Sequence, residues 1–143
     1  MTNEILVEGA VSTALKKKVR LLAGKILESS GIRRKSLDVI FLSNRRMRFL
    51  KNKFLPGRKG PANTLSFRET GKFCHPEVKY PYLGEIYVNL DLTKGKMVSI
   101  KPLLIHSILH ILGYGHREGR DTIKMDRKAR KLMKINLFQC LKS

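Results

Sequence analysis

Three histidines within eleven residues are the part of this chain whose types and spacing best suit chemistry. His106, His110 and His116 occur in the segment H-S-I-L-H-I-L-G-Y-G-H. Residues four apart lie on one face of a helix, so His106 and His110 can converge on one ion. Gly113 and Gly115 allow the chain to turn and bring His116 back toward the same point. Three imidazoles with one open position are the ligand set of a catalytic zinc site.

The residue after the first histidine indicates which reaction such a metal serves. A metalloprotease of the H-E-x-x-H type has a glutamate there as general base. This chain has Ser107 instead, and a serine hydroxyl cannot accept a proton from a metal-bound water at neutral pH. A zinc ion, or another divalent metal, polarises a phosphoryl oxygen and lowers the pKa of its bound water toward about 7. The pattern therefore favours hydrolysis of a phosphodiester over hydrolysis of a peptide.

The net charge favours the same class of substrate. The chain has 30 Lys and Arg residues against 11 Asp and Glu, a formal net charge of +19 at pH 7. Such an excess attracts polyanions. The net charge is +11 over residues 1–61, +2 over residues 62–116 and +6 over residues 117–143. Positive charge therefore flanks the histidines, as expected of a neutral centre with cationic surfaces for a long RNA. This spread disfavours a metallohydrolase for a small molecule.

Two adjoining segments contain the expected RNA-binding residues. A short helix capped by Asn44 is predicted to place Met47, Leu50 and Phe54 on one side and basic residues on the other. Residues 56–61 follow as a rigid basic loop, because they include two prolines and two glycines. Phosphate contacts from these cations make RNA affinity depend on salt. The expected RNA-binding residues are Arg45, Arg46, Arg48, Lys51 and Lys59.

Several classes of protein are disfavoured by the sequence. No stretch approaches the roughly 20 apolar residues that a membrane-spanning helix needs, and the acidic N-terminal residues do not resemble a secretory signal. Cys74 and Cys140 lie 66 positions apart without a C-x-x-C motif. Neither a disulfide framework nor a disulfide-linked partner is therefore expected. We expect a cytoplasmic protein without a membrane partner, and the sequence carries no signal for an oligomeric state.

The elements that position these residues are predicted to form a single domain over residues 1–143. Pro102 suits the first turn of the histidine helix, which is expected to have its cap near Ser99. The mixed order of elements predicts an α+β fold, a small mixed β-sheet packed by helices, with the histidine site on a helix and the following glycine turn. Strands are expected at Glu4–Glu8, Leu37–Leu42, Thr64–Phe67 and Leu83–Asn89. Helices are expected at Val11–Leu27, after Asn44, from Ser99 to Leu112, and at Gly119–Leu137.

The histidine segment closely resembles the H-G-x-L-H-L-x-G-Y-D-H signature of the YbeY endoribonuclease family of bacterial rRNA maturation factors. Residues Pro61–Phe67 are similar to the family's P-T-D/N-V-L-S-F strand, and Leu83–Ile86 to its L-G-D-I block. Met125 falls where the family has a methionine in its last helix. The resemblance implies one metal ion, usually zinc, held by the three histidines. It also implies single-strand-specific endoribonuclease activity on small-subunit rRNA, notably at its 3′ end, and a role in ribosome quality control.

Three positions depart from the family pattern. Ser107 replaces a glycine, and Gly115 replaces the aspartate before the third histidine. Pro56 stands where the family has a functionally important arginine, so Arg58 is the expected catalytic residue that grips the phosphate. Loss of the arginine and the aspartate favours an alternative, a non-catalytic RNA-binding assembly factor with a structural or vestigial zinc. Three ligands with an open position favour the enzyme, because structural zinc sites normally have four protein ligands.

Overall fold

Four strands form one mixed sheet in the order β1-β2-β4-β3. Strand β1 (Glu4–Glu8) pairs in parallel with β2 (Ser36–Leu42), which pairs in parallel with β4 (Tyr82–Asn89). Strand β3 (Thr64–Arg68) is antiparallel to β4 and forms one edge. These elements come from a computed structural model, which describes residues 3–57, 62–69, 80–114 and 119–135.

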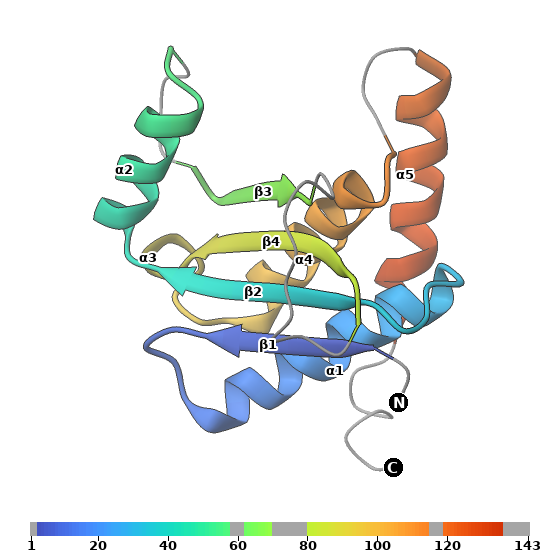
Figure 1. Cartoon of the computed structure of the whole chain (residues 1–143), viewed down its shortest axis with the longest axis horizontal. Coiled ribbons are helices and arrows are strands. Elements are labelled where there is room, and N and C mark those ends of the chain that lie inside the picture. The colour runs from blue at the N-terminus through green and yellow to red at the C-terminus, as the bar shows by residue number, and fades with distance from the viewer. Residues whose placement is uncertain (1–2, 58–61, 70–79, 115–118, 136–143) are drawn as a thin grey trace.

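Apolar and polar side chains alternate along the strands, so the sheet has one apolar face and one more polar face. The register places Val39 of β2 beside Ile86 of β4, and both side chains are fully buried. The intervening positions, such as Asp38 beside Glu85, point to the other face, which we call the open face. The apolar face is covered by two helices, α1 (Thr13–Ser29) and α4 (Met97–Ile111), as Figure 1 shows.

Helix α4, which has the first two histidines, begins earlier than the sequence predicts. It starts at Met97 after Lys96, so the expected cap near Ser99 is wrong and Pro102 lies inside the helix. The apolar run of α4, including Ile100, Leu104 and Ile108, is buried against the sheet and α1. The free energy from this burial holds the helix despite the N–H group that proline lacks.

Helix α5 (Gly119–Met133) packs against α4 and stands beside the sheet in Figure 1. Met125 and Leu132 are buried in the core, as their helical spacing predicts, whereas Met133 is exposed. The helix ends at Met133 rather than at Leu137, which lies outside the described residues. The ammonium group of Lys101 on α4 donates to the carbonyl oxygens of Met133 (2.8 Å) and Ile135 (2.7 Å), so it caps this end of α5.

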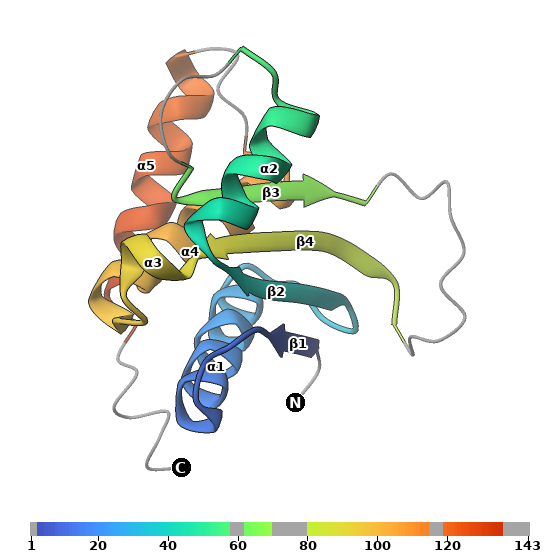
Figure 2. The ribbon, with the colours of Figure 1, turned by 90° about the vertical axis from the view of Figure 1, so that its left-hand side faces the viewer.

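Helix α2 (Asn44–Phe54) lies on the open face across β3 and β4, as Figure 2 shows. Its cap is Ser43, whose hydroxyl accepts from the N–H of Arg46, and not Asn44 as expected. The Asn44 side chain instead accepts from the amide of Asn89 (3.0 Å), which is fully buried. The same amide donates to the carbonyl of Ala62 (3.1 Å), so Asn89 ties the start of α2 to the start of β3.

The short helix α3 (Leu90–Thr93) was not expected from the sequence. Its first turn is capped by the Asn89 side chain, which accepts from the N–H of Leu92. The predicted fold class is otherwise confirmed, because helices pack on both faces of a small mixed sheet. Among the described residues, every helix is too short or too polar to cross a membrane.

Candidate metal and RNA site

His106 and His110 lie one turn apart on α4, as their spacing predicts. Their ring centroids are 4.7 Å apart, and the rings meet edge to face at 71°. His106 is exposed and His110 is half-buried, so both imidazoles are accessible from solvent. Most of the other side chains in this half of α4 are buried, including Leu109 and Ile111. The two histidines are therefore the polar edge of an otherwise apolar helix.

The chain leaves α4 through a tight turn directly after His110. The N–H of Gly113 donates to the carbonyl of His110 and the N–H of Tyr114 to that of Leu109, both at 3.0 Å. This pair of bonds is a Schellman motif, which requires a residue with positive φ, and Gly113 has φ +99°. The predicted glycine turn is therefore present at Gly113, whereas Gly115 and His116 lie outside the described residues.

The observed histidine pair fits a shared zinc ion. Zinc lies about 2.0–2.1 Å from an imidazole nitrogen in tetrahedral sites, which places the centroids of two ligand rings about 5 Å apart. The observed 4.7 Å is close to that spacing. Within the described part of the chain, no further histidine, cysteine or carboxylate completes a group of three.

Two neighbours of the histidines, Ser107 and Tyr114, lie in or against the core. Ser107 is buried in the protein, whereas the neighbouring His106 is exposed. Tyr114, the residue after Gly113, is partly buried and packs against the core.

Arg68 is a candidate site residue that the sequence did not single out. Its Nη1 atom lies 3.7 Å from the position that a Cβ atom on Gly113 would occupy. The last carbonyls of α4, at Ile108, Leu109 and His110, already accept backbone N–H groups. Among the described residues, no hydrogen bond or ion pair holds this guanidinium group. Arg68 therefore places a cation with available donors at the end of the histidine helix.

Close packing of two strands sets the position of Arg68. Strand β3 brings it to the α4 face of the sheet, opposite Gly84 of β4. A Cβ atom on Gly84 would collide with the carbonyl oxygen of Phe67 and lie 3.2 Å from the Cα of Arg68. Glycine in the L-G-E-I block is therefore what lets the two backbones approach. Strand alternation beyond Phe67 is the sequence signal that would have found Arg68, because Ser66 and Arg68 share one face.

The structure describes four of the five expected RNA-binding residues, all on α2. Arg45, Arg46 and Arg48 are exposed, as expected. Lys51 is only 6% exposed and interacts with other groups of the protein, so its expected place on the solvent side of the helix is wrong. Lys59 and the expected catalytic residue Arg58 lie outside the described residues.

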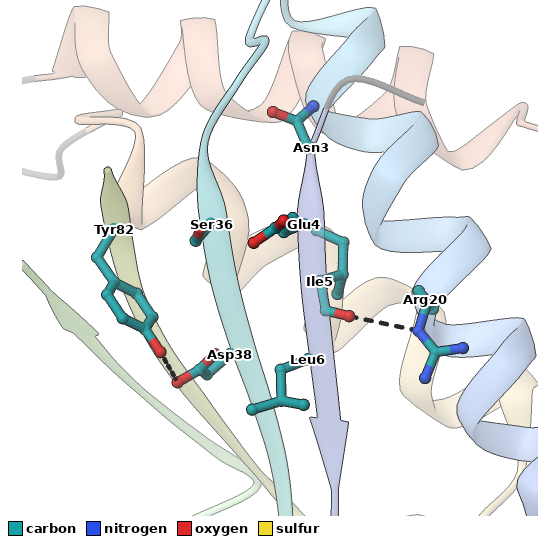
Figure 3. A pocket seen from close by; sticks show the side chains of 8 residues that line it. All are labelled: Asn3, Glu4, Ile5, Leu6, Arg20, Ser36, Asp38 and Tyr82. Carbon is teal, nitrogen blue, oxygen red and sulfur yellow. Dashed lines mark hydrogen bonds between the residues drawn. The ribbon is translucent and has the colours of Figure 1, made fainter. Parts of the chain in front are cut away.

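The open face near β1 has the opposite character. A cavity of about 440 Å³ lies between β1 and Tyr82, and Figure 3 shows Glu4 and Asp38 among its lining side chains. The Tyr82 hydroxyl donates to Asp38 at 2.7 Å. Leu6, which also lines this cavity, is half exposed. These carboxylates make this end of the open face unfavourable for a polyanion.

Comparison with known proteins identifies the family. Residues 4–136 match the sequence profile of the family described as Endoribonuclease YbeY. The chain belongs to the YbeY endoribonuclease family. Membership confirms the family expected from the histidine segment and the expected class of RNA-hydrolysing enzyme.

Individual YbeY relatives match over most or part of this chain. An Endoribonuclease YbeY of a Sulfurihydrogenibium species is 28% identical over 133 residues, covering 86% of this chain and 85% of the relative. That of Neorickettsia sennetsu is 31% identical over 91 residues, covering 58% of this chain and 61% of the relative's length. The solution structure of a Thermotoga maritima protein has the same fold, with a TM-score of 0.55 and 23% identity over 90% of this chain and 85% of that one.

Proposed function

We propose that this YbeY protein is a metal-dependent, single-strand-specific endoribonuclease that matures small-subunit rRNA at its 3′ end and contributes to ribosome quality control. The observation that best supports the proposal is the histidine pair on α4, with ring centroids 4.7 Å apart, together with the Arg68 guanidinium near the following turn, which no described group binds. An rRNA substrate implies the small ribosomal subunit as partner and the cytoplasm as location. We take residues 1–143 as a single catalytic domain.

His106, His110 and His116 would hold the metal, most simply one zinc ion. Zinc bound there supplies a Lewis acid for a phosphoryl oxygen. Gly113 contributes by ending α4 sharply, which allows the chain to return toward the histidines.

Arginine side chains supply the phosphate contacts in this proposal. Arg68 is suited to grip the scissile phosphate because its guanidinium has donors that the described protein groups do not use. Arg58 is a second candidate for the same role. Arg45, Arg46, Arg48 and Lys59 are proposed to line the RNA path, with Lys51 beneath the surface of α2 as a support.

A cleavage assay with a matched variant tests the proposal. Purified protein is incubated with single-stranded fragments of the rRNA 3′ region, with and without a chelator, alongside His110→Ala and the control Val98→Ala on the same helix. We expect cleavage that the chelator and His110→Ala abolish and Val98→Ala preserves. Metal content measured on the same samples should fall in His110→Ala only.

The result that would overturn the proposal is tight, salt-sensitive RNA binding without cleavage in the presence of any divalent metal. That outcome would establish the alternative, a non-catalytic RNA-binding assembly factor. The replacement of the family arginine by Pro56 and of the aspartate by Gly115 is the feature that favours it.

A further inference from the structure

A cavity of about 740 Å³ lies between α2 and the open face of the sheet, apart from the histidines. Leu50 and Phe49 line it from the helix, Tyr87 from β4, and Arg45 and Arg46 from the first turn of α2. The volume falls within the about 300–1,000 Å³ of pockets that bind small organic ligands. It is therefore large enough for one nucleotide. We call it the α2 pocket.

Phe49 is the unusual residue of the α2 pocket. Its ring is 67% exposed, although a phenylalanine on an amphipathic helix ordinarily packs into the core. Phe54 on the same helix is also partly exposed, but its ring meets Phe67 edge to face with centroids 5.3 Å apart. Phe49 has no such ring partner among the described residues. It therefore offers an exposed aromatic surface on which a ligand can stack.

The sheet side of the α2 pocket is fixed in place. The Tyr87 ring meets Phe67 edge to face with centroids 5.8 Å apart, and its hydroxyl donates to Glu85 at 2.6 Å. Burial raises the pKa of Tyr87 well above its ordinary value, and the hydrogen bond to Glu85 raises it further. The Tyr87 ring is therefore held by both of these contacts and forms a fixed wall of the pocket.

The charges of the residues that line the α2 pocket indicate which kind of ligand it binds. Two exposed arginines line it, and none of its lining residues is a carboxylate. The cavity beside β1 is lined by two carboxylates, Glu4 and Asp38, and by one arginine, Arg20 of α1. A ligand with both an aromatic ring and a phosphate matches the α2 pocket, because the ring can stack on Phe49 while the phosphate pairs with the guanidinium groups.

We propose that the α2 pocket binds one unstacked nucleotide of a single-stranded RNA, with the base on Phe49 and the phosphate between Arg45 and Arg46. This inference rests on the proposed function, since it takes RNA as the substrate. Tyr87 faces away from α4, so the α2 pocket and the histidines lie on opposite sides of the sheet. The pocket is an anchoring subsite away from the cleaved bond. Base-paired RNA cannot enter it, because its bases remain stacked.

A fluorescence experiment tests the pocket without relying on cleavage. The chain has no tryptophan, so Phe49→Trp introduces a single reporter that can itself stack on a base. We expect saturable quenching of this tryptophan by a ten-nucleotide single-stranded RNA and little quenching by a duplex of the same length. In binding assays, Phe49→Ala should weaken single-strand binding at least about fivefold, the lower range for loss of one stacked base.

Leu6→Trp is the matched control, because Leu6 is also exposed on the open face but lies among carboxylates. RNA should leave this tryptophan unquenched. Replacing Arg45 and Arg46 by alanine in the Phe49→Trp protein should raise the RNA concentration needed for quenching. Equal quenching at both tryptophans, equal quenching by duplex, or quenching by inorganic phosphate alone would overturn the proposal.

Combining the reporter with His110→Ala separates this proposal from the proposed function. RNA should still quench the tryptophan at position 49 when cleavage is lost. Quenching in a protein that cleaves no RNA under any condition would preserve the α2 pocket and defeat the nuclease. Metal-dependent cleavage without quenching, and with full affinity in Phe49→Ala, would preserve the nuclease and defeat the pocket.

Discussion

Arg68 is the side chain whose removal is expected to affect cleavage most among the described arginines. Arg68→Ala removes a charged donor beside the turn after α4, and a hydrogen bond to a charged group contributes about 1.5–3 kcal/mol. We therefore expect single-turnover cleavage of single-stranded RNA to slow by about 10- to 100-fold, since each factor of ten corresponds to about 1.4 kcal/mol.

Two comparisons distinguish a phosphate contact from a structural role for Arg68. Arg68→Lys keeps the charge but loses the planar fork, so partial recovery of the rate is expected. Arg33→Ala removes an exposed arginine from the turn before β2 and should leave the rate unchanged. The assignment is wrong if Arg68→Ala lowers the melting temperature and the rate together and Arg68→Lys restores neither.

Tyr87 gives a prediction for alkaline pH. Burial raises its pKa above the ordinary value of 10.0, and Glu85 adds to the shift. Above about pH 10 the unfolded chain loses the tyrosine proton while the folded chain retains it, so the free energy of unfolding falls as pH rises. Tyr87→Phe lacks this loss. In urea titrations, the stability of the wild-type protein relative to Tyr87→Phe should fall between pH 10 and pH 11, whereas a constant difference would contradict the assignment.

The histidine pair could be predicted because helical periodicity alone brings residues four apart together, whatever the rest of the fold does. The position of Arg68 depends on the strand partner, the absence of a Cβ on Gly84 and the turn after α4, which are contacts distant in sequence. The prediction that Lys51 is exposed was wrong for a related reason. Its place on a helical wheel predicts exposure, but the contacts around it in the folded protein bury it.

At the level of elements, Gly84 controls whether β3 can pair with β4. A Cβ there meets the Phe67 carbonyl, which cannot move without disturbing the strand pairing, and Gly84 has φ +152°. We expect Gly84→Ala to lower the free energy of unfolding by about 1–3 kcal/mol, the usual cost of overpacking. Urea denaturation measures the change, and amide hydrogen exchange should show the loss of protection in β3.

Gly24→Ala is the control for Gly84→Ala. Gly24 lies within α1, and a Cβ there has no neighbouring atom within 4 Å. Alanine is favoured over glycine in a helix by about 1 kcal/mol, so this variant should be unchanged or more stable. Equal destabilisation by both substitutions would show that the approach of β3 to β4 is not the cause.

The sequence predicted the four strands to within a residue or two, because apolar alternation and turn residues mark them locally. It did not predict that β4 lies between β2 and β3, since strand order depends on long-range pairing. The cap of α2 was misassigned because Ser43 and Asn44 are both good caps, and the buried amide of Asn89 engages Asn44. Pro102 was predicted to lie in the first turn of α4. Burial of the apolar side chains in the core instead extends this helix on the N-terminal side of Pro102, to Met97.

At the level of the whole molecule, the excess of basic residues divides into structural and exposed groups. Lys101 caps α5, and the ammonium of Lys128 donates to the carbonyl of Ser29 at the end of α1 (3.0 Å). Arg45 and Arg46 are exposed, and among the described residues their side chains donate to no backbone carbonyl. Substitution of a structural lysine should therefore lower stability, whereas substitution of an exposed arginine should change RNA binding.

The salt dependence of RNA binding distinguishes the exposed basic residues from the structural ones. For single strands the slope of log K against log salt is about −0.7 for each neutralised phosphate. Because Arg45 and Arg46 are proposed to hold the same phosphate, the double variant Arg45→Ala, Arg46→Ala should reduce the magnitude of the slope by about 0.7. Lys101→Met should leave the slope unchanged and lower the melting temperature, because its role is to cap a helix. A reduced slope in Lys101→Met would show that the cation contacts RNA instead.

The carboxylates at the β1 end of the open face have a kinetic consequence. Glu4, Glu8 and Asp38 gather negative charge on one side of a strongly positive protein, so the molecule has an electric dipole moment as well as a net charge. In the field of an approaching polyanion, such a dipole rotates the acidic side away before contact. A larger share of diffusional collisions then occurs in the correct orientation, and the gain in association rate decreases as ionic strength rises.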